Sequence, residues 1–393
     1  MKMKVILTGG GTAGHINPAL AIAETILRYA PDSEIIFVGN KRGKETDLVP
    51  REGYSLYFTK SKGIDRNGKN TIVRTLKRVA PSNLHAYWLA ATSPYMPRTV
   101  RILKAFQPDL VIGTGGYACW PIMAAATRMG YCTAVHESNS VPGLAIRRLQ
   151  DKVDDIWVNF PKTAERIAAK EKTAVVGNPL RLRFASVSYE EARKRLGILP
   201  SERFILSFGG SLGAEEVSLA ALELMRDYSS KTAGIRHLHA TGKKDYAKIK
   251  KQYDQYALRE ANGCILTDYI YDMPLQMAAA DLVISRAGAM TLSELARMKK
   301  CAVLIPSPNV AENHQYHNAK EFADASAAVL VEEKTLTEGR LTEETRKLLG
   351  DGARMKRMQE AIGGFAPDDP NRIIWERIVA LTKNNQKREV KKE

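Results

Sequence analysis

Short apolar segments alternate with helical patterns along this chain of 393 residues, and the whole alternation occurs twice. Val, Ile and Leu dominate several of the segments, which is typical of parallel strands buried on both faces. Strands separated by helices predict a parallel sheet with helices on both sides. We therefore expect an α/β fold of two doubly wound, Rossmann-like domains, with strands at residues 4–8, 34–38, 110–113, 132–136, 156–158 and 174–176, and then at 204–208, 236–240, 264–267, 282–285, 302–305 and 327–330.

The join between the two domains is expected at Gly177-Asn178-Pro179, because glycine and proline favour an irregular connection. This gives domains of ordinary size at residues 1–176 and 177–365, and a basic tail at 384–393. Each domain opens with a strand and a glycine-rich turn, and such sheets bind ligands at the carboxyl ends of their strands. Two such domains facing each other would place both turns at one central cleft.

The charge of the chain suggests an anionic partner. There are 59 Lys and Arg against 43 Asp and Glu, a formal charge of +16, and residues 60–104 contain ten basic residues and one acid. A nucleic acid, a phosphorylated substrate or an acidic membrane surface would suit this excess. Within that segment, LHAYWL at residues 84–89 has the composition of a membrane-surface element. The alternative is an ordinary core helix with a solvated basic face.

The sequence predicts a cytoplasmic location. No apolar run approaches the roughly 20 residues of a membrane span, and the apolar start of the chain breaks at glycines too early for a signal peptide. Any membrane contact should therefore be peripheral. The four cysteines are far apart and form no C-x-x-C pair, so we expect buried thiols at Cys119, Cys132, Cys264 and Cys301.

The first glycine-rich turn, GGGTAGH at residues 9–15, has the composition of an anion-binding loop. Glycines let backbone N–H groups approach an anion, and the next helix presents its positive N-terminus. No Gly-Lys-Ser/Thr follows, so this is not a P-loop. The spacing fits G-x-G-x-x-G, but Gly39-Asn40-Lys41 stands where a ribose-binding acid is expected, which argues against NAD. A tight turn without a ligand is the alternative.

His15 lies at the start of the helix that follows this turn. An imidazole there could take a proton from an attacking hydroxyl group. It could equally do no more than position the loop or a bound sugar. The sequence leaves both roles open.

Two further turns suit a phosphate. GGSLGA at residues 209–214 offers backbone amides and the Ser211 hydroxyl at a helix start. In SRAGAMTLSE at residues 285–294, the amides of Ala289, Met290 and Thr291 are candidate diphosphate ligands. Glu294 could accept hydrogen bonds from both hydroxyls of a ribose. The alternative is an ordinary first helical turn, in which Ser293 and Glu294 are favoured by the helix dipole.

A set of short motifs in fixed order resembles the N-acetylglucosaminyltransferases of glycosyltransferase family 28, over residues 4 to about 330. The motifs are GGGTAGHINP (9–18), DLVP (47–50), GTGGY (113–117), HESN (136–139), VGNPLR (176–181), GGS (209–211), SRAGA (285–289) and NHQY (313–316). The resemblance implies a GT-B fold, in which two Rossmann-like domains face a central cleft. It also implies a C-terminal helix, here residues 366–383, that returns to the first domain.

By match to the family's motifs, the second domain would hold UDP-N-acetylglucosamine. Thr12, Ala13 and Gly14 would face the sugar and phosphate end of the donor, and Asn139 and Gln315 would contact its sugar hydroxyls. Arg181 and Ser211 would contact the nucleotide and phosphate, and Ile270 would meet the uracil through its backbone. The diphosphate and ribose would be held by Ala289, Met290, Thr291, Leu292, Ser293 and Glu294. The chain departs from the common family residues at Ala13, Leu212 and His314, and residues 68–97 form a longer segment.

The implied reaction is an inverting transfer to lipid I, the undecaprenyl-linked acceptor of peptidoglycan synthesis, at the cytoplasmic face of the membrane. The C4 hydroxyl of the muramoyl sugar attacks C1 of N-acetylglucosamine, and UDP leaves. His15 is the candidate base and Glu137 the reserve, and helix N-termini with backbone amides would stabilise the leaving diphosphate. The sequence has no Asp-x-Asp motif, and His314 and His317 have no evident acidic or cysteine partner, so no metal or other cofactor is expected.

Three other functions remain as alternatives. A GT-B glycosyltransferase acting on another lipid, such as diacylglycerol, would share the donor half. A UDP-sugar 2-epimerase would share the architecture and need neither an acceptor nor a membrane element. A nucleic-acid binder is motivated by the charge alone. Because the sequence shows no helix-turn-helix, zinc or aromatic RNA-binding motif, no nucleic-acid partner is expected.

Overall fold

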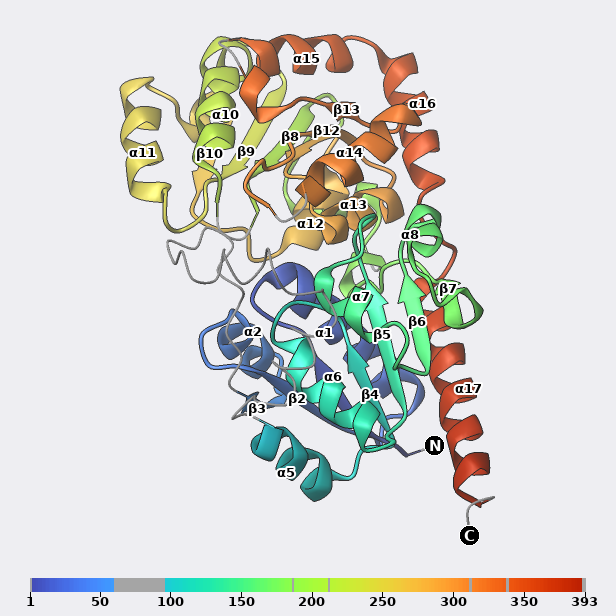
Figure 1. The fold of residues 1–393 in the computed structure, drawn as a ribbon. Helices are drawn as coiled ribbons and strands as arrows, with labels where there is room; N and C mark the ends of the chain where they lie inside the picture. The colour runs from blue at the N-terminus through green and yellow to red at the C-terminus, as the bar shows by residue number, and fades with distance from the viewer. Residues whose placement is uncertain are drawn as a thin grey trace, which may run out of the picture. The chain divides into compact units, whose positions relative to one another are not determined.

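The computed structural model describes residues 2–59, 96–185, 187–210, 213–310, 313–336 and 339–390. The chain forms two compact units (Figure 1). Unit 1 comprises Met1–Ser138, Pro142–Pro179 and Asp369–Glu393, and unit 2 comprises Asn139–Val141 and Leu180–Asp368. Each unit is built on one parallel sheet with helices between its strands, so the expected α/β fold of two Rossmann-like domains is confirmed.

Unit 1 contains a seven-stranded sheet in the order β3-β2-β1-β4-β5-β6-β7, with all neighbours parallel. The order reverses between β1 and β4, so the turns after these two strands are neighbours at the carboxyl edge. The elements are β1 (Lys4–Thr8), α1 (Ala13–Tyr29), β2 (Glu34–Asn40), α2 (Glu45–Arg51), β3 (Ser55–Thr59), α5 (Met96–Phe106), β4 (Leu110–Gly113), α6 (Cys119–Arg128), β5 (Thr133–Glu137), α7 (Leu144–Leu149), β6 (Asp155–Val158), α8 (Pro161–Arg166), the short 3-10 helix η1 (Lys170–Lys172), β7 (Thr173–Val175) and α17 (Pro370–Val390).

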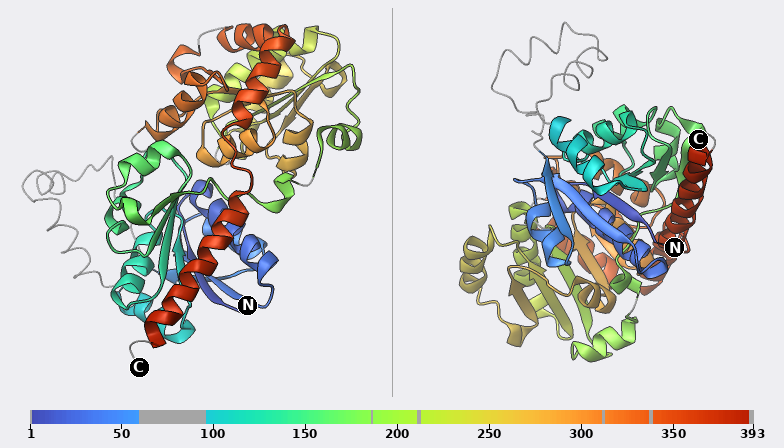
Figure 2. Two further views of the ribbon diagram at one scale, coloured as in Figure 1. Left: turned by 90° about the vertical axis from the view of Figure 1, so that its right-hand side faces the viewer. Right: turned by 90° about the horizontal axis from the view of Figure 1, so that it is seen from below.

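Two apolar cores cover the faces of this sheet. On one face, Val5 and Leu7 of β1 pack with α1, α2 and the C-terminal helix α17. On the other face, Ile6 packs with α5, α6 and α7. Figure 2 shows α17 lying along the sheet of unit 1. The helix runs to Val390, well into residues 384–393, where the sequence led us to expect a tail.

Polar contacts fix α17 to unit 1. Arg377 donates two hydrogen bonds to the carboxylate of Asp155, at 2.8 and 2.6 Å, and the indole N–H of Trp157 donates a third at 2.8 Å. Asp155 is 3% exposed, so its charge needs these donors. The ring of Trp375 stacks on Tyr29 of α1 at 5.2 Å. The last helix therefore completes a domain that begins at the first strand.

Unit 2 contains a six-stranded sheet in the order β10-β9-β8-β11-β12-β13, again with parallel neighbours and a reversal between β8 and β11. One apolar core joins this sheet to α10, α15 and α16. The elements are η2 (Leu182–Ala185), α9 (Tyr189–Arg195), β8 (Arg203–Phe208), α10 (Glu215–Asp227), η3 (Ser229–Lys231), β9 (Ile235–Ala240), α11 (Tyr246–Gln255), η4 (Glu260–Asn262), β10 (Cys264–Thr267), α12 (Met273–Ala279), β11 (Leu282–Ser285), α13 (Ala289–Arg297), β12 (Cys301–Leu304), α14 (His314–Asp324), β13 (Val329–Leu330), η6 (Glu333–Thr335), α15 (Arg340–Leu349) and α16 (Gly352–Gly363).

The edge strand β3 was not expected from the sequence. This strand pairs on one side only, and its exposed residues Ser55 and Tyr57 alternate with more buried ones. It therefore lacks the continuous apolar run that marked the central strands. The other strands of both sheets lie within three residues of the expected bounds.

The membrane element expected at residues 84–89 lies outside the described residues. The basic side chains that follow it, Arg98, Arg101 and Lys104, are exposed on α5. Within the described ranges, no helix is both long and apolar enough to cross a membrane. Cys119, Cys132, Cys264 and Cys301 are all buried as thiols.

A buried polar chain crosses the sheet of unit 2. The hydroxyl of Ser207 in β8 lies 2.7 Å from His237 Nε2 and 2.8 Å from His239 Nδ1, both in β9. Ser229 Oγ lies 3.1 Å from the other ring nitrogen of His237. Burial lowers the pKa of His239 to about 3 and holds the pKa of His237 well below its usual range. In unit 1, burial likewise lowers the pKa of His136 to about 4.

These three histidines should make the protein sensitive to mild acid. The unfolded chain binds protons at its histidines as pH falls through about 6.5, whereas the folded chain keeps these three neutral. Stability should therefore be full above that pH and fall below it, by about 1.4 kcal/mol per pH unit for each histidine. Urea unfolding followed by circular dichroism in a pH series measures the slope. His317→Gln, at an exposed histidine, should leave the slope unchanged, and a stability that stays level in mild acid would contradict the prediction.

Candidate active-site residues

The first glycine-rich turn connects β1 to α1 and is held by the turn that follows β4. Thr114 Oγ1 donates a hydrogen bond to the carbonyl of His15 at 2.6 Å. Gly116 has a φ of +76° and lies close to Gly10. A Cβ added at Gly116 would lie 2.2 Å from the carbonyl oxygen of Gly10. The two turns therefore touch through backbone at the point where the strand order reverses.

The His15 imidazole is held from two sides. Its Nδ1 lies 3.0 Å from the hydroxyl of Thr12. Its ring also packs against Gly115, where a Cβ would come within 2.8 Å of ring atom Cδ2 and where φ is +94°. The position of this imidazole thus depends on a hydroxyl in its own turn and on a glycine in the neighbouring turn.

Glu45, which was not singled out from the sequence, is hydrogen-bonded to this turn through its carboxylate. Its Oε2 accepts the N–H of Gly11 at 3.0 Å, and its Oε1 accepts the N–H of Asn40 at 2.9 Å. The side chain is buried, with the residue 1% exposed. Burial and the Glu45 charge together raise the pKa of Tyr117. Only the position of Glu45, two residues before the DLVP motif and among glycines, could have drawn attention to it.

Glu137 and His136 end β5 and are both buried. Glu137 Oε2 accepts the N–H of Gly143 at 2.7 Å, at the N-terminus of α7. The His136 ring donates from Nε2 to the carbonyl of Gly177 at 3.0 Å, which fixes its neutral tautomer. Both side chains are therefore bonded to the backbone of their own unit.

In unit 2, α13 begins directly after the turn that follows β11. Its N-cap is Gly288, which provides no side chain to cap the helix. The first hydrogen bond within the helix is donated by Leu292 to the Gly288 carbonyl at 3.0 Å. The N–H groups of a helix's first turn have no acceptor within the helix, so their acceptors lie outside it. The side chains of Met290 and Leu292 are buried in the unit, so these residues could contribute only their backbone.

Glu294 lies one turn into α13. Burial raises the pKa of its carboxyl group to about 8, and the nearby Arg183 opposes this shift. Ser293 donates a hydrogen bond from its hydroxyl to the Ala289 carbonyl at 3.1 Å. A carboxyl group whose pKa lies so close to neutrality in a candidate ligand site is a common mark of function.

Asn139 belongs to unit 2 although its neighbours in the chain belong to unit 1. Asn318 of α14 donates to Asn139 Oδ1 at 3.4 Å and to the carbonyl of Ala287 at 3.4 Å, and it accepts the N–H of Ser140 at 3.0 Å. On the same helix, Gln315 Oε1 accepts the N–H of Ser307 at 2.9 Å. Asn318 therefore joins Asn139 to the turn that leads into α13.

Comparison with known proteins decides the family. The model of the glycosyltransferase family 28 N-terminal domain matches residues 5–158, and that of the family 28 C-terminal domain matches residues 204–369. This chain belongs to glycosyltransferase family 28. The family 28 regions together take in most of both units, so the protein is a glycosyltransferase.

Relatives of this family 28 chain share its full length. A protein of Acetivibrio thermocellus is 38% identical over 97% of this chain and 99% of its own. One of Thermoanaerobacter sp. strain X514 is 34% identical over 97% of this chain and all of its own. Both are named UDP-N-acetylglucosamine--N-acetylmuramyl-(pentapeptide) pyrophosphoryl-undecaprenol N-acetylglucosamine transferase.

Solved structures share the fold. Acinetobacter baumannii MurG has a TM-score of 0.70 at 23% identity and covers 96% of this chain and 99% of its own. A putative UDP-N-acetylglucosamine 2-epimerase from Listeria monocytogenes has a TM-score of 0.65 at 14% identity, covering 98% and 96%. These likenesses establish the GT-B class of the family 28 chain and no more.

The candidate residues fall into two sets, one in each unit. Unit 1 carries Thr12, Ala13, Gly14, His15 and Glu137, of which the first four form one turn. Unit 2 carries Asn139, Arg181, Ile270, Gln315 and the six residues from Ala289 to Glu294. Ser211 lies outside the described residues. Among the residues that are described, no cluster of three or more His, Cys, Asp or Glu side chains could hold a metal ion.

Arg286, the cation of the SRAGA motif, is a further residue whose role the sequence did not reveal. Its guanidinium donates to the carbonyls of Ile305 and Pro306, each at 3.2 Å, and forms a largely buried ion pair with Glu333. Arg286 therefore fastens the turn before α13 to the ends of the neighbouring strands. In this family 28 chain the cation of the SRAGA motif is therefore bonded within its own unit.

Proposed function

We propose that this family 28 enzyme transfers N-acetylglucosamine from UDP-N-acetylglucosamine to the C4 hydroxyl of the muramoyl sugar of undecaprenyl-linked lipid I. The anomeric centre is inverted, and the product is lipid II of peptidoglycan synthesis. The observation that carries the proposal is the 38% identity, along nearly the whole of both chains, to a relative named for this transfer.

The donor is bound by unit 2. The first amides of α13 hold the diphosphate at the positive end of the helix, and Glu294 accepts hydrogen bonds from the ribose. Asn139 and Gln315 contact the sugar hydroxyls, which suits side chains already oriented by Asn318 and by the Ser307 amide. Further contacts come from Arg181, Ser211 and the backbone of Ile270.

His15 is the base that deprotonates the acceptor hydroxyl. When Nδ1 carries the proton and donates it to the Thr12 hydroxyl, Nε2 is the basic nitrogen. The Thr12 hydroxyl can accept this hydrogen bond, which is the arrangement that the reaction needs, and Thr12, Ala13 and Gly14 bring the turn to the transferred sugar. Glu137 accepts a backbone N–H with one oxygen, so we assign it to positioning the β5–α7 turn and keep it as the reserve base.

The leaving UDP gains negative charge as the glycosidic bond breaks. Fixed amide dipoles at the start of α13 stabilise that charge without reorganising, and removing one such donor from a comparable site typically costs about 100-fold or more in rate. This arrangement supplies by backbone what other transferases obtain from a metal ion.

We also propose that the enzyme works peripherally at the cytoplasmic face of the membrane. The support is the lipid-linked acceptor and the exposed basic residues Arg98, Arg101 and Lys104 on α5. Each basic residue close to an anionic surface contributes about 1 kcal/mol. The residues that precede α5 carry further basic and aromatic side chains in the sequence.

Transfer of labelled N-acetylglucosamine to defined acceptors tests the function. We expect product with lipid I, and we expect the rate to persist in the presence of a chelator because amides stabilise the diphosphate. Diacylglycerol serves as the matched acceptor control. Transfer to diacylglycerol but not to lipid I would make the protein a different lipid glycosyltransferase, and conversion of UDP-N-acetylglucosamine without any acceptor would make it an epimerase.

His15→Ala should lower kcat by about 100-fold or more, because general bases contribute 10²- to 10⁴-fold. UDP affinity should stay close to the wild-type value, since the nucleotide contacts lie in unit 2. His15→Asn separates the two roles of the histidine. The amide of asparagine can still bond to Thr12 but cannot take a proton. If His15 is the base, His15→Asn should therefore be as slow as His15→Ala. Near-normal turnover in His15→Asn would leave His15 with positioning alone.

The affinity for UDP should rise with pH through the pKa of Glu294. The pKa of this carboxyl is about 8, so the form that accepts two ribose hydrogen bonds gains population from pH 7 to 9. We expect UDP to bind up to about tenfold more tightly over that range. Calorimetry on wild type and Glu294→Gln measures it, and the variant should bind weakly at every pH. Glu343→Gln, at an exposed carboxylate of α15, is the control. Equal affinity and equal pH dependence in Glu294→Gln would remove the ribose assignment.

A further inference from the structure

A pocket of about 290 Å³ lies in unit 2 at the last turn of α13. Its walls include Arg297 and Met298 at the end of this helix, Phe184 of η2, and Lys300, which precedes β12. The amides that we assign to the diphosphate lie at the other end of the same helix, which has nine residues and is therefore about 13 Å long. The pocket is thus separate from the proposed donor site.

Lys300 brings a buried positive charge to this pocket. The residue is 5% exposed, and its Nζ donates to the carbonyls of Ala278 and Ala280 at 2.6 and 3.0 Å. The ammonium group lies 4.9 Å from the ring centroid of Tyr189, another wall residue. Burial lowers the pKa of Lys300 to about 8, although the charge of Asp281 opposes this shift. Carbonyls and a ring offer partial charges only, so the ammonium lacks a full counter-charge in direct contact.

The nearby carboxylate of Asp281 is bonded to other donors. It pairs with Arg193 at 3.0 Å and with Arg203 at 3.4 Å, and it accepts the hydroxyl of Tyr189 at 2.9 Å. No ion pair within the described part of the chain includes Lys300. Two guanidinium groups and the ammonium therefore share the field of one buried carboxylate, which leaves an excess of positive charge beside the pocket.

The remaining walls combine apolar surface with a second cation. Phe184 and Met298 lie beside the ring of Tyr189, and aromatic rings and methionine sulfur both pack well against a bound ring. Arg297 is exposed at the rim and donates to the carbonyl of Asp368 at 3.0 Å. A guanidinium can bind a carboxylate through a pair of N–H groups. Ligand pockets usually measure about 300 to 1,000 Å³, so this volume suits a ligand smaller than a nucleotide.

We propose that this pocket binds a small organic carboxylate with an aromatic ring. The carboxylate lies against Lys300 and Arg297, and the ring packs on Tyr189, Phe184 and Met298. Such a ligand supplies the counter-charge to the buried ammonium and covers the apolar walls at the same time. The site is additional to the proposed transfer reaction, because its residues are neither the assigned donor contacts nor the assigned base.

Phenylacetate is the probe that tests this site, and phenylacetamide is its neutral analogue. Calorimetry and ligand-observed NMR on the full chain measure both affinities at about pH 7, below the pKa of Lys300, so that the ammonium is charged. We expect saturable binding of phenylacetate to the wild-type protein. It should bind at least about tenfold more tightly than phenylacetamide, because hydrogen bonds between charged groups are roughly twice as strong as neutral ones.

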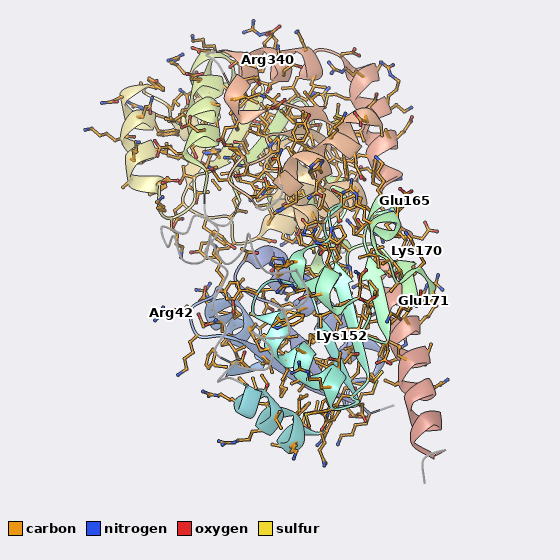
Figure 3. The ribbon with its side chains drawn as sticks, in the orientation of Figure 1. Arg42, Lys152, Glu165, Lys170, Glu171 and Arg340 are labelled. Carbon is orange, nitrogen blue, oxygen red and sulfur yellow. The ribbon has the colours of Figure 1, made fainter. Side chains whose placement is uncertain are left out.

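Lys300→Met separates the charge from the apolar walls. Methionine keeps an unbranched side chain without the ammonium, so phenylacetate should bind at least about tenfold more weakly while phenylacetamide stays within about twofold. Arg297→Met, at an exposed position, should also weaken phenylacetate selectively and gives a second route if Lys300→Met fails to fold. Arg340→Met is the matched control and should keep the wild-type affinities. Arg340 is an exposed cation of α15 that pairs with Glu344 and is labelled in Figure 3.

Three results would overturn the proposed site. They are no saturable phenylacetate binding by the wild type, equal affinities for the acid and its amide, and displacement of phenylacetate by saturating UDP, which would place the probe in the donor site. None of these measurements requires sugar transfer. A protein that binds phenylacetate as expected but transfers no sugar would therefore contradict the proposed function and leave this site intact.

Discussion

Backbone N–H groups at the start of a helix need an acceptor, and the two units meet this need differently. In unit 1, the turn before α1 obtains the buried carboxylate of Glu45. In unit 2, the N-cap Gly288 has no side chain to offer α13. One sheet thus has, after its first strand β1, a turn that contains a carboxylate of the protein, and the other has, after β11, a helix whose N-cap is a glycine. This difference in acceptors underlies the division of labour that we propose between proton transfer and departure of the nucleotide.

The fold could be predicted from the sequence because buried parallel strands leave a strong local signal. Val, Ile and Leu runs located nearly every central strand, and glycine-rich turns located the carboxyl edges. β3 escaped because an edge strand needs no continuous apolar run. The sequence pattern beyond about residue 333 predicts helix, but the return of the last helix to the first unit was expected only through the family resemblance. No local pattern around Arg377 identifies Asp155 as its partner.

The candidate site could be predicted only in part, and for a physical reason. Motifs mark residues that are close in the chain, such as the turn that ends at His15 and the first turn of α13. The contacts of Glu45 with Gly11 and of Asn318 with Asn139 join residues 34 and 179 positions apart. Tertiary contacts also decide whether the side chain of a motif residue is available to a ligand. The Leu292 side chain lies in the core, and Arg286 is bonded to backbone carbonyls and to Glu333. Such roles depend on tertiary contacts that no local pattern contains.

Unit 1 is discontinuous in the chain, because α17 supplies Ile374 and Ile378 to the core that Val5 and Leu7 begin. A growing chain leaves the ribosome N-terminus first, at about 5–20 residues per second. The first strand must therefore wait for more than 360 residues to be synthesised before its sheet is fully covered. Unit 2, whose sheet is formed by one continuous stretch of chain, can fold during that delay. Translation would thus complete unit 2, to which we assign the nucleotide, before unit 1, which carries His15.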